Sequence, residues 1–461
     1  MLVVVGIVVF VAALLASIGL HELGHLIPAK KFGVKVTQYM IGFGPTLFSR
    51  RKGETEYGFK LVPLGGYVRM VGMFPPGKPS ASAEMEPVDT ETETDKRPAG
   101  VRAEPAGETL PDGNSKTFFG SMIGQAREED HKEIVTEEDE RRAFYNLAPW
   151  KKIVVMMSGP VTNLIIAIIL FVSIFALFGV PAATNQIETV TPCFVAGQPV
   201  TAPIVQNGDN VCPAGSARTP AAAAGIRPGD RIVAVNTKPA DSWEDFLAEL
   251  KNAQPGENTV TVARDDGEAV LPVTLVEVPV VQAGAGKRVF LGVSPQFALV
   301  RTAPSEVPGQ IARIAGQSVK GLVSFPAKIG ALAKTVVSDT ERDPEGPVGV
   351  VGVSRVSGEV AAADVPPSWK FVQILGLVAS INLFLFLFNM LPILPLDGGH
   401  IVGAVYEAGK RKLAKWQGKP DPGPVDVARA LPIAYAVTGV FILISLLILY
   451  ADIFKPIMIT K

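Results

Sequence analysis

The sequence has few side chains that form disulfides or bind transition metals: its 461 residues include two cysteines, Cys193 and Cys212, and four histidines. Two cysteines cannot form a metal site by themselves. The net charge of −1 and the lack of a basic stripe with interleaved aromatic residues give no indication of nucleic-acid binding. The opening apolar run lacks a basic leading segment and a small-residue cleavage site, so we expect a retained transmembrane helix rather than a removed signal peptide.

This first apolar run ends on a polar motif, His21-Glu22-Leu23-Gly24-His25, and no charged side chain precedes Glu22. Residues four apart lie on the same face of a helix, so His21 and His25 can point at one small volume. Two imidazoles with a neighbouring carboxylate are typical of a zinc hydrolase, in which Glu22 would be the general base. The alternative is a chance match, in which both histidines only form hydrogen bonds near a helix end.

Four apolar segments are long enough to cross a bilayer, which takes about 20 helical residues. They predict a mostly α polytopic membrane protein with about four transmembrane helices, in the cell membrane. We assign these segments to residues 1–30, 150–180, 369–408 and 430–453. Basic residues follow the first segment, precede the second and fill a linker, 409–429, between the last two, so these ends are predicted to be cytoplasmic. The active site then faces the cytoplasm, whereas both termini and the region 181–368 lie outside.

Two regions of different character separate the first two apolar segments. Residues 31–74 contain β-prone runs with Gly and Pro turns, including Gly66-Tyr67-Val68, and predict a membrane-associated β-hairpin or sheet. Such a sheet either accepts an extended peptide by strand addition or is only structural. Residues 75–145 are rich in Pro, Ser, Thr and acidic residues, which predicts a mostly disordered cytoplasmic insert with a short helix over its charged stretch.

Residues 185–282 predict a compact extracytoplasmic α+β domain. Within it the stretch 225–232, Gly-Ile-Arg-Pro-Gly-Asp-Arg-Ile, resembles a PDZ domain, which implies binding of an extended peptide or, in a degenerate domain, exclusion of bulky substrates. Residues 283–368 predict a linking strand and an amphipathic helix. Cys193 and Cys212 fall in the PDZ-like domain, on the predicted oxidising side, either as a disulfide or as two free thiols.

A catalytic zinc site usually has three protein ligands and a water, so a third ligand is expected. Asp397 is the one acid at this depth of the third apolar region, in a stretch that Pro and Gly interrupt. Because interrupted backbone at membrane depth is tolerated only inside protein or beside a water-filled cavity, Asp397 is the expected ligand. Two alternatives remain: Asp397 as a helix N-cap, or His400 as the ligand. Asn389 is a candidate donor to the oxyanion or to the substrate backbone.

Five motifs are distributed along the chain. They are His-Glu-Leu-Gly-His at 21–25, Ile-Gly-Phe-Gly-Pro at 41–45, Pro-Leu-Gly-Gly-Tyr-Val-Arg-Met at 63–70, Ser-Gly-Pro-Val-Thr-Asn at 158–163, and the stretch 389–399. Together they resemble the site-2 protease family of intramembrane zinc proteases, in particular its PDZ-containing bacterial branch, similar to the regulator-of-sigma-E protease. One PDZ-like unit is visible where some relatives have two, and the insert at 75–143 has no counterpart that we can place.

The resemblance assigns roles to individual residues. It implies Zn2+ on His21, His25 and Asp397, with Glu22 as the base. It also implies that Asn389 lies near the substrate and that Gly66, Tyr67 and Val68 belong to a β-loop that guides the substrate.

The implied activity is hydrolysis of peptide bonds in or near the transmembrane helix of single-span membrane proteins, in regulated intramembrane proteolysis. A typical substrate in the family is an anti-sigma factor that another protease has already shortened, with membrane lipid around both proteins. One alternative is a non-catalytic PDZ membrane scaffold with a vestigial metal site, but a structural zinc site needs no base such as Glu22. A second alternative, a membrane-anchored protease of soluble peptides, expects a ligand in 181–368, which contains no histidine.

Overall fold

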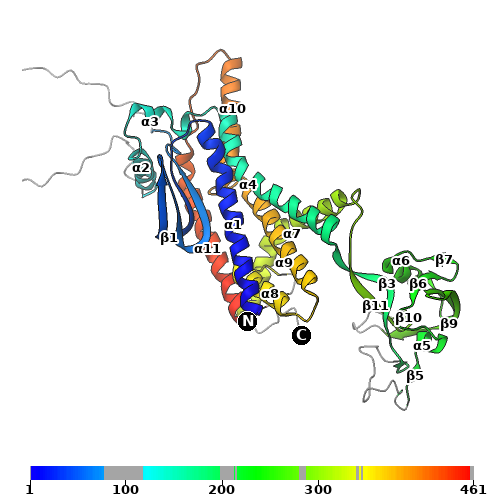
Figure 1. Cartoon of the computed structure of the whole chain (residues 1–461). Coiled ribbons are helices and arrows are strands. Elements are labelled where there is room, and N and C mark those ends of the chain that lie inside the picture. The colour runs from blue at the N-terminus through cyan, green and yellow to red at the C-terminus, as the bar shows by residue number, and fades with distance from the viewer. Residues whose placement is uncertain are drawn as a thin grey trace, which may run out of the picture. The chain divides into compact units, whose positions relative to one another are not determined.

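The chain forms two compact units, which we describe separately (Figure 1). The first contains Met1–Ser173 and Ser305–Lys461, and the second contains Ile174–Pro304. The computed structural model describes residues 2–76, 118–197, 212, 215–279, 287–338, 342–343 and 346–456.

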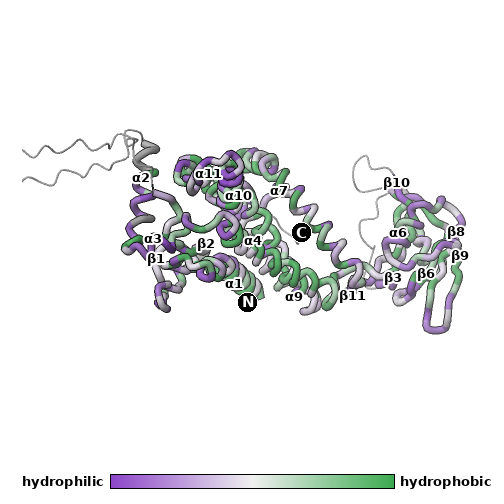
Figure 2. Tube along the Cα trace, turned by 90° about the horizontal axis from the view of Figure 1, so that it is seen from above, coloured by the Kyte–Doolittle hydropathy of each residue, from purple (hydrophilic) through white to green (hydrophobic). Residues whose placement is uncertain are grey.

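In the described part of the chain, four helices are long and apolar enough to cross a membrane. They are α1 (Leu2–Lys31), α4 (Pro149–Val172), α9 (Pro367–Asn389) and α11 (Leu431–Phe454), with a π-helical turn η2 (Ser173–Phe178) after α4 and a 3-10 turn η3 (Val427–Ala430) before α11. Helix α4 packs against both α1 and α9. Figure 2 shows α4 and α9 largely in green, the colour of apolar residues. The prediction of about four transmembrane helices is confirmed.

The third apolar region, expected over 369–408, is interrupted. Helix α9 ends at Asn389, and a new helix, α10 (Asp397–Trp416), begins after a turn that contains two prolines. Helix α10 continues into the range 409–429 that we expected to be a linker. The reason is local composition: Ala, Glu, Lys, Arg and Leu all favour helix, so the chain leaves it only near Gly418, where φ is +67°.

A bent β-hairpin lies beside α1. Its strands are β1 (Val36–Lys52) and β2 (Thr55–Met70), which together contain the β-prone runs of residues 31–74. Residues 36–41 pair with 66–70 on one side and with 56–59 on the other, while 48–52 pair with 55–59. Glycines with positive φ at 42, 44 and 65 permit the bends. Among the described residues, 66–70 therefore form one edge of this small sheet.

Only part of the expected insert can be compared, because 77–117 lie outside the described residues. The remainder contains helices α2 (Phe118–His131) and α3 (Glu137–Arg141) and the 3-10 turn η1 (Phe144–Asn146). Asp139 forms a capping box with Thr136 at the start of α3. The Lys35 ammonium, 2.8 Å from the Asp139 carboxylate, lowers the pKa of that carboxyl to about 2. This ion pair attaches α3 to the segment before β1.

Two more helices complete the first unit. Helix α7 (Val307–Val337) corresponds to the expected amphipathic helix, whereas α8 (Val350–Ala362) is not expected from the sequence. Helix α8 packs against α1, where Ser357 Oγ donates a hydrogen bond to the carbonyl of Gly6 (3.1 Å).

The described residues of the second unit form a β-sheet domain with two short helices, α5 (Pro220–Ala224) and α6 (Trp243–Asn252). Its main sheet has the order β10-β9-β8-β6-β3-β11, with β7 beside β6, and β4 and β5 form a separate pair. The strands are β3 (Val180–Val190), β4 (Cys193–Phe194), β5 (Ala217–Arg218), β6 (Arg231–Val235), β7 (Lys238–Pro239), β8 (Gly256–Arg264), β9 (Gly267–Pro279), β10 (Lys287–Phe290) and β11 (Val293–Val300). Ile232, Phe246 and Val260 lie in its core. A disulfide joins Cys193 to Cys212.

Candidate metal centre

Three side chains from two distant parts of the chain converge in the first unit. His21 and His25 lie one turn apart on α1, and their Nε2 atoms are 3.2 Å apart. Oδ2 of Asp397, the first residue of α10, lies 3.4 Å from Nε2 of each histidine. Both histidines are buried, at 9% and 5% exposure.

The spacing of these three donor atoms fits a zinc ion. Four ligands at about 2.0 Å in a tetrahedron stand about 3.3 Å from one another. The three separations in the structure, 3.2, 3.4 and 3.4 Å, lie close to that value. Two imidazole nitrogens and one carboxylate oxygen are also the donor types of a catalytic zinc site, which keeps its fourth position for water.

Glycines bring α1 and α4 together at this centre. A Cβ atom added to Gly159 of α4 would lie 2.1 Å from Nε2 of His25, and one added to Gly24 of α1 would lie 2.6 Å from Oγ1 of Thr162. Real Cβ atoms do not approach so closely, so neither position accepts a side chain in this packing. The close contact lets α4 supply partners for the outer nitrogens of both imidazoles.

The outer hydrogen bonds orient both rings. Nδ1 of His25 lies 2.8 Å from the carbonyl oxygen of Val155 and donates to it, because a carbonyl can only accept. The Nε2 atom of neutral His25 then presents its lone pair toward Asp397. Metal-bound histidines in proteins usually have such an acceptor on their second nitrogen.

Asn163 occupies the equivalent place beside His21. Its Nδ2 lies 3.1 Å from Nδ1 of His21, while its buried Oδ1 has no hydrogen-bond partner among the described residues. A half-turn of the amide exchanges these two atoms, and Nδ1–H of His21 then donates to Oδ1. In that arrangement both imidazoles present Nε2 lone pairs to the same point.

The turn before α10 places Asp397. Cβ atoms added to Gly398 and Gly399 would lie 2.2 Å from the carbonyl oxygen of Leu391 and 2.7 Å from the amide nitrogen of Leu394, so this turn needs both glycines. Leu396, not Asp397, is the N-cap of α10. The Asp397 carboxylate instead reaches the two histidines, at the positive end of its own helix.

Glu22 faces the edge of the small sheet. A Cβ atom on Gly66 would lie 2.9 Å from Cγ of Glu22, so the backbone at Gly66 passes directly beside the Glu22 side chain. Tyr39 of the neighbouring strand donates a hydrogen bond to the carbonyl of Gly19 on α1 (2.7 Å), which fixes the sheet against the helix. Tyr67 donates to Oε1 of Gln38 (3.1 Å) and stacks on Phe43.

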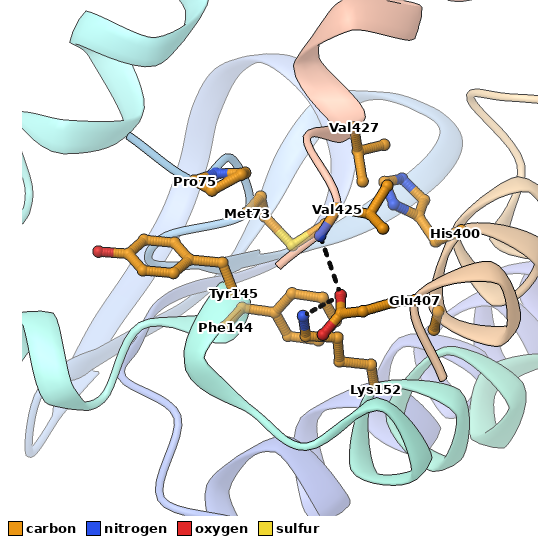
Figure 3. Close-up of a pocket in the computed structure, with 11 residues that line it drawn as sticks. Met73, Pro75, Phe144, Tyr145, Lys152, His400, Glu407, Val425 and Val427 are labelled. Atoms are coloured by element: carbon orange, nitrogen blue, oxygen red, sulfur yellow. Dashed lines mark hydrogen bonds and ion pairs between the residues drawn. The ribbon is translucent and has the colours of Figure 1, made fainter. Parts of the chain in front are cut away.

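The remaining candidates are not among the three converging donor groups. Asn389 is the last residue of α9, and among the described residues its side chain has no hydrogen bond to them. His400 lines a small cavity with Lys152 and Glu407 (Figure 3) and does not join the donor group.

Three features of α4 have no role assigned from the sequence: Gly159, Asn163 and the backbone carbonyl of Val155. The motif at 158–163 contains Gly159 and Asn163, but we used it only as a mark of resemblance. The carbonyl of Val155 gives no sequence signal at all, because any residue type supplies a backbone acceptor.

A multi-pass membrane protein with a buried His-His-Asp cluster and an adjacent glutamate has the features of a membrane metalloprotease, and comparison with known proteins agrees. The model of peptidase family M50 matches residues 9–419. The zinc metalloprotease Rip1 of Mycobacterium tuberculosis is 31% identical over 99% of both chains, and Rip1 of Mycolicibacterium smegmatis is 30% identical over 98% of both. The chain therefore belongs to peptidase family M50. The expected family, the enzyme class (a zinc metalloprotease) and the zinc cofactor are confirmed.

Proposed function

We propose that this chain is an intramembrane protease in which His21, His25 and Asp397 hold zinc and Glu22 is the general base. The observation that carries the proposal is the convergence of two α1 imidazoles and the α10 carboxylate to separations of 3.2–3.4 Å. An ionisable cluster between membrane-spanning helices is costly and usually serves a function.

The chemistry divides between the ion and the protein. Zinc supplies Lewis acidity, which makes water nucleophilic at neutral pH and polarises a carbonyl. Glu22 accepts the proton from the attacking water and passes it to the leaving amine. Val155 and Asn163 hold the two imidazoles in the orientation that leaves their Nε2 atoms free for the metal.

The substrate that this site fits best is the transmembrane helix of a single-span membrane protein. A helix hides its carbonyl groups in hydrogen bonds, so the substrate must unwind before cleavage. The edge strand 66–70, containing Gly66, Tyr67 and Val68, offers unpaired backbone groups beside Glu22 and would hold an unwound segment by strand addition. Asn389 would donate to the substrate backbone. An anti-sigma factor already shortened by another protease is the substrate class that we propose.

The second unit, which contains the predicted domain 185–282 and also the later strand β11, is proposed to be a PDZ-like domain on the extracytoplasmic side. The observation in its favour is that β11 pairs with β3 alone among the described residues and leaves an edge for an extended peptide. The basic ends of the membrane-spanning helices favour an active site near the cytoplasmic side.

The assignment of Glu22 can be tested with the purified protein and a model transmembrane peptide. Glu22→Gln keeps the shape of the side chain but cannot accept the proton, so we expect cleavage to fall at least about 100-fold while zinc content stays at the wild-type level. The same change at exposed Glu268 is the control and should leave both unchanged. Wild-type cleavage by Glu22→Gln would contradict the role of Glu22 as base.

A further inference from the structure

A buried ion pair links two helices of the metal centre at a distance from the metal ligands. Nζ of Lys152 on α4 lies 2.8 Å from Oε2 of Glu407 on α10, and the two side chains are only 8% and 3% exposed. The backbone N–H of Val425 also donates to Oε2 (3.2 Å), and an Arg411 nitrogen lies 2.9 Å from Oε1. Figure 3 shows the carboxylate of Glu407 between Lys152 and Val425, on the wall of a cavity of about 20 Å³, room for one water.

Each partner belongs to a helix that contributes to the candidate site. Lys152 lies one helical turn before Val155, whose carbonyl accepts the hydrogen bond from His25. Glu407 lies on the same helix as Asp397, which begins α10. The pair therefore connects the helix that orients the imidazoles to the helix that supplies the carboxylate.

The other contacts between α4 and α10 do not define the relative position of these helices as well. The buried residues of α10 before Glu407 are Gly398, Ile401 and Ala404, which are small or apolar. Contacts of this kind are non-directional, although close packing still limits how far the helices can shift. A buried charge pair has one favourable geometry, because a shift of α10 leaves Lys152 without its carboxylate in a poorly solvated place, whereas Glu407 keeps only Arg411 of its own helix.

We propose that Lys152 and Glu407 are positioning residues: their ion pair holds α10 in register with α4 and so keeps the Asp397 carboxylate at bonding distance from His21 and His25. This inference rests on the proposed zinc ligands. It adds that the ion pair determines the distance between the ligands on α1 and the ligand on α10. Loss of the pair would displace one ligand from the other two and weaken zinc binding without touching any ligand.

The test uses the full chain with Lys152→Met and Glu407→Gln. Zinc affinity is measured by competition with a chelator, and the ligand geometry by the absorption spectrum of the Co2+-loaded protein. We expect each variant to bind zinc more weakly, by up to the roughly 10- to 100-fold loss that is typical when a direct outer partner of a ligand is removed, and to change the Co2+ spectrum. Lys152→Arg, which keeps the charge, should recover most of the affinity.

The double variant Lys152→Met, Glu407→Met separates positioning from the cost of an unpaired buried charge. It leaves no unpaired charge from this pair, so thermal stability should rise above that of either single variant. If the pair positions the ligands, zinc affinity should stay low in the double variant. If the double variant recovered both thermal stability and zinc affinity, the proposal would be overturned. The same holds if the single variants lose stability but keep the wild-type zinc affinity and Co2+ spectrum.

The chain offers a matched control in a second buried ion pair. Arg342 and Asp452 approach to 3.0 Å at 4% and 1% side-chain exposure, and Asp452 also accepts from the amides of Gly349 and Gly352, away from the metal centre. Asp452→Asn should lower stability with no change in zinc affinity. An equal loss of zinc affinity in Asp452→Asn would make the effect global and overturn the proposal. Zinc binding that survives His21→Ala would instead contradict the ligand assignment, whatever the pair does.

Discussion

The orientation of His21 depends on one amide from another helix. Nδ1 of His21 faces Asn163, 142 residues further along the chain, and this contact is buried. Without an acceptor on Nδ1, the neutral ring can place its proton on Nε2, which removes the lone pair that a metal needs. The rotation of the ring would also be less restricted.

Asn163→Leu should therefore weaken zinc binding about 10- to 100-fold, measured by competition with a chelator. Asn163→Asp keeps an acceptor at the same place and should bind zinc far better than Asn163→Leu. Thr162→Val, a substitution of similar size at the preceding residue of α4, is the control, and it should bind zinc like the wild type. If Asn163→Leu also bound zinc with wild-type affinity, the Asn163 amide would have no part in orienting His21.

At the scale of elements, the contact between α1 and α4 sets the place of His25. The space that a side chain on Gly159 would need is already filled by the His25 ring, so Gly159→Ala must move the ring or the helix. We expect this variant to lose most of its bound zinc, measured as metal per protein after purification. Gly376→Ala on α9 is the matched control, since a Cβ there has nothing within 4 Å. Full zinc content in Gly159→Ala would contradict the close packing.

The sequence predicts those elements whose signal is local. Four apolar runs are visible because each lies within one stretch of chain, and His21 and His25 are visible because they share one helical turn. Asp397 could be predicted because acids are rare at that depth. The halves of β1 and β2 could not be paired from sequence, since the bends at Gly42, Gly44 and Gly65 decide the register.

Contacts between distant segments explain most of what sequence reasoning missed. Lys152 and Glu407 are 255 residues apart, and in the sequence each looks like an ordinary charge near the end of an apolar run or in a basic helix. Burial distinguishes them, and burial depends on how α10 packs against α4. The start of α10 at Asp397 likewise follows from a turn that only Gly398 and Gly399 can form.

At the scale of the whole molecule, the chain has a membrane unit and a β-sheet unit, and we propose that they have different functions, catalysis and substrate selection. The proposed PDZ-like domain would act before cleavage, by excluding proteins that keep a bulky extracytoplasmic domain. The first unit contains all the proposed catalytic residues, so selection by size and chemistry would reside in different units.

Selection by size can be tested with the intact protein and a series of single-span substrates. The transmembrane segment is kept constant, and the extracytoplasmic part is either a short tail or a folded domain. We expect rapid cleavage of the short-tailed substrate and at least about tenfold slower cleavage of the other, with Glu22→Gln as the background in both cases. A tenfold difference corresponds to about 1.4 kcal/mol in the activation free energy, which a steric barrier easily exceeds. Equal rates for both substrates would contradict exclusion, and inhibition by a free peptide with a C-terminal carboxylate would instead indicate that the domain binds chain ends at its β11 edge.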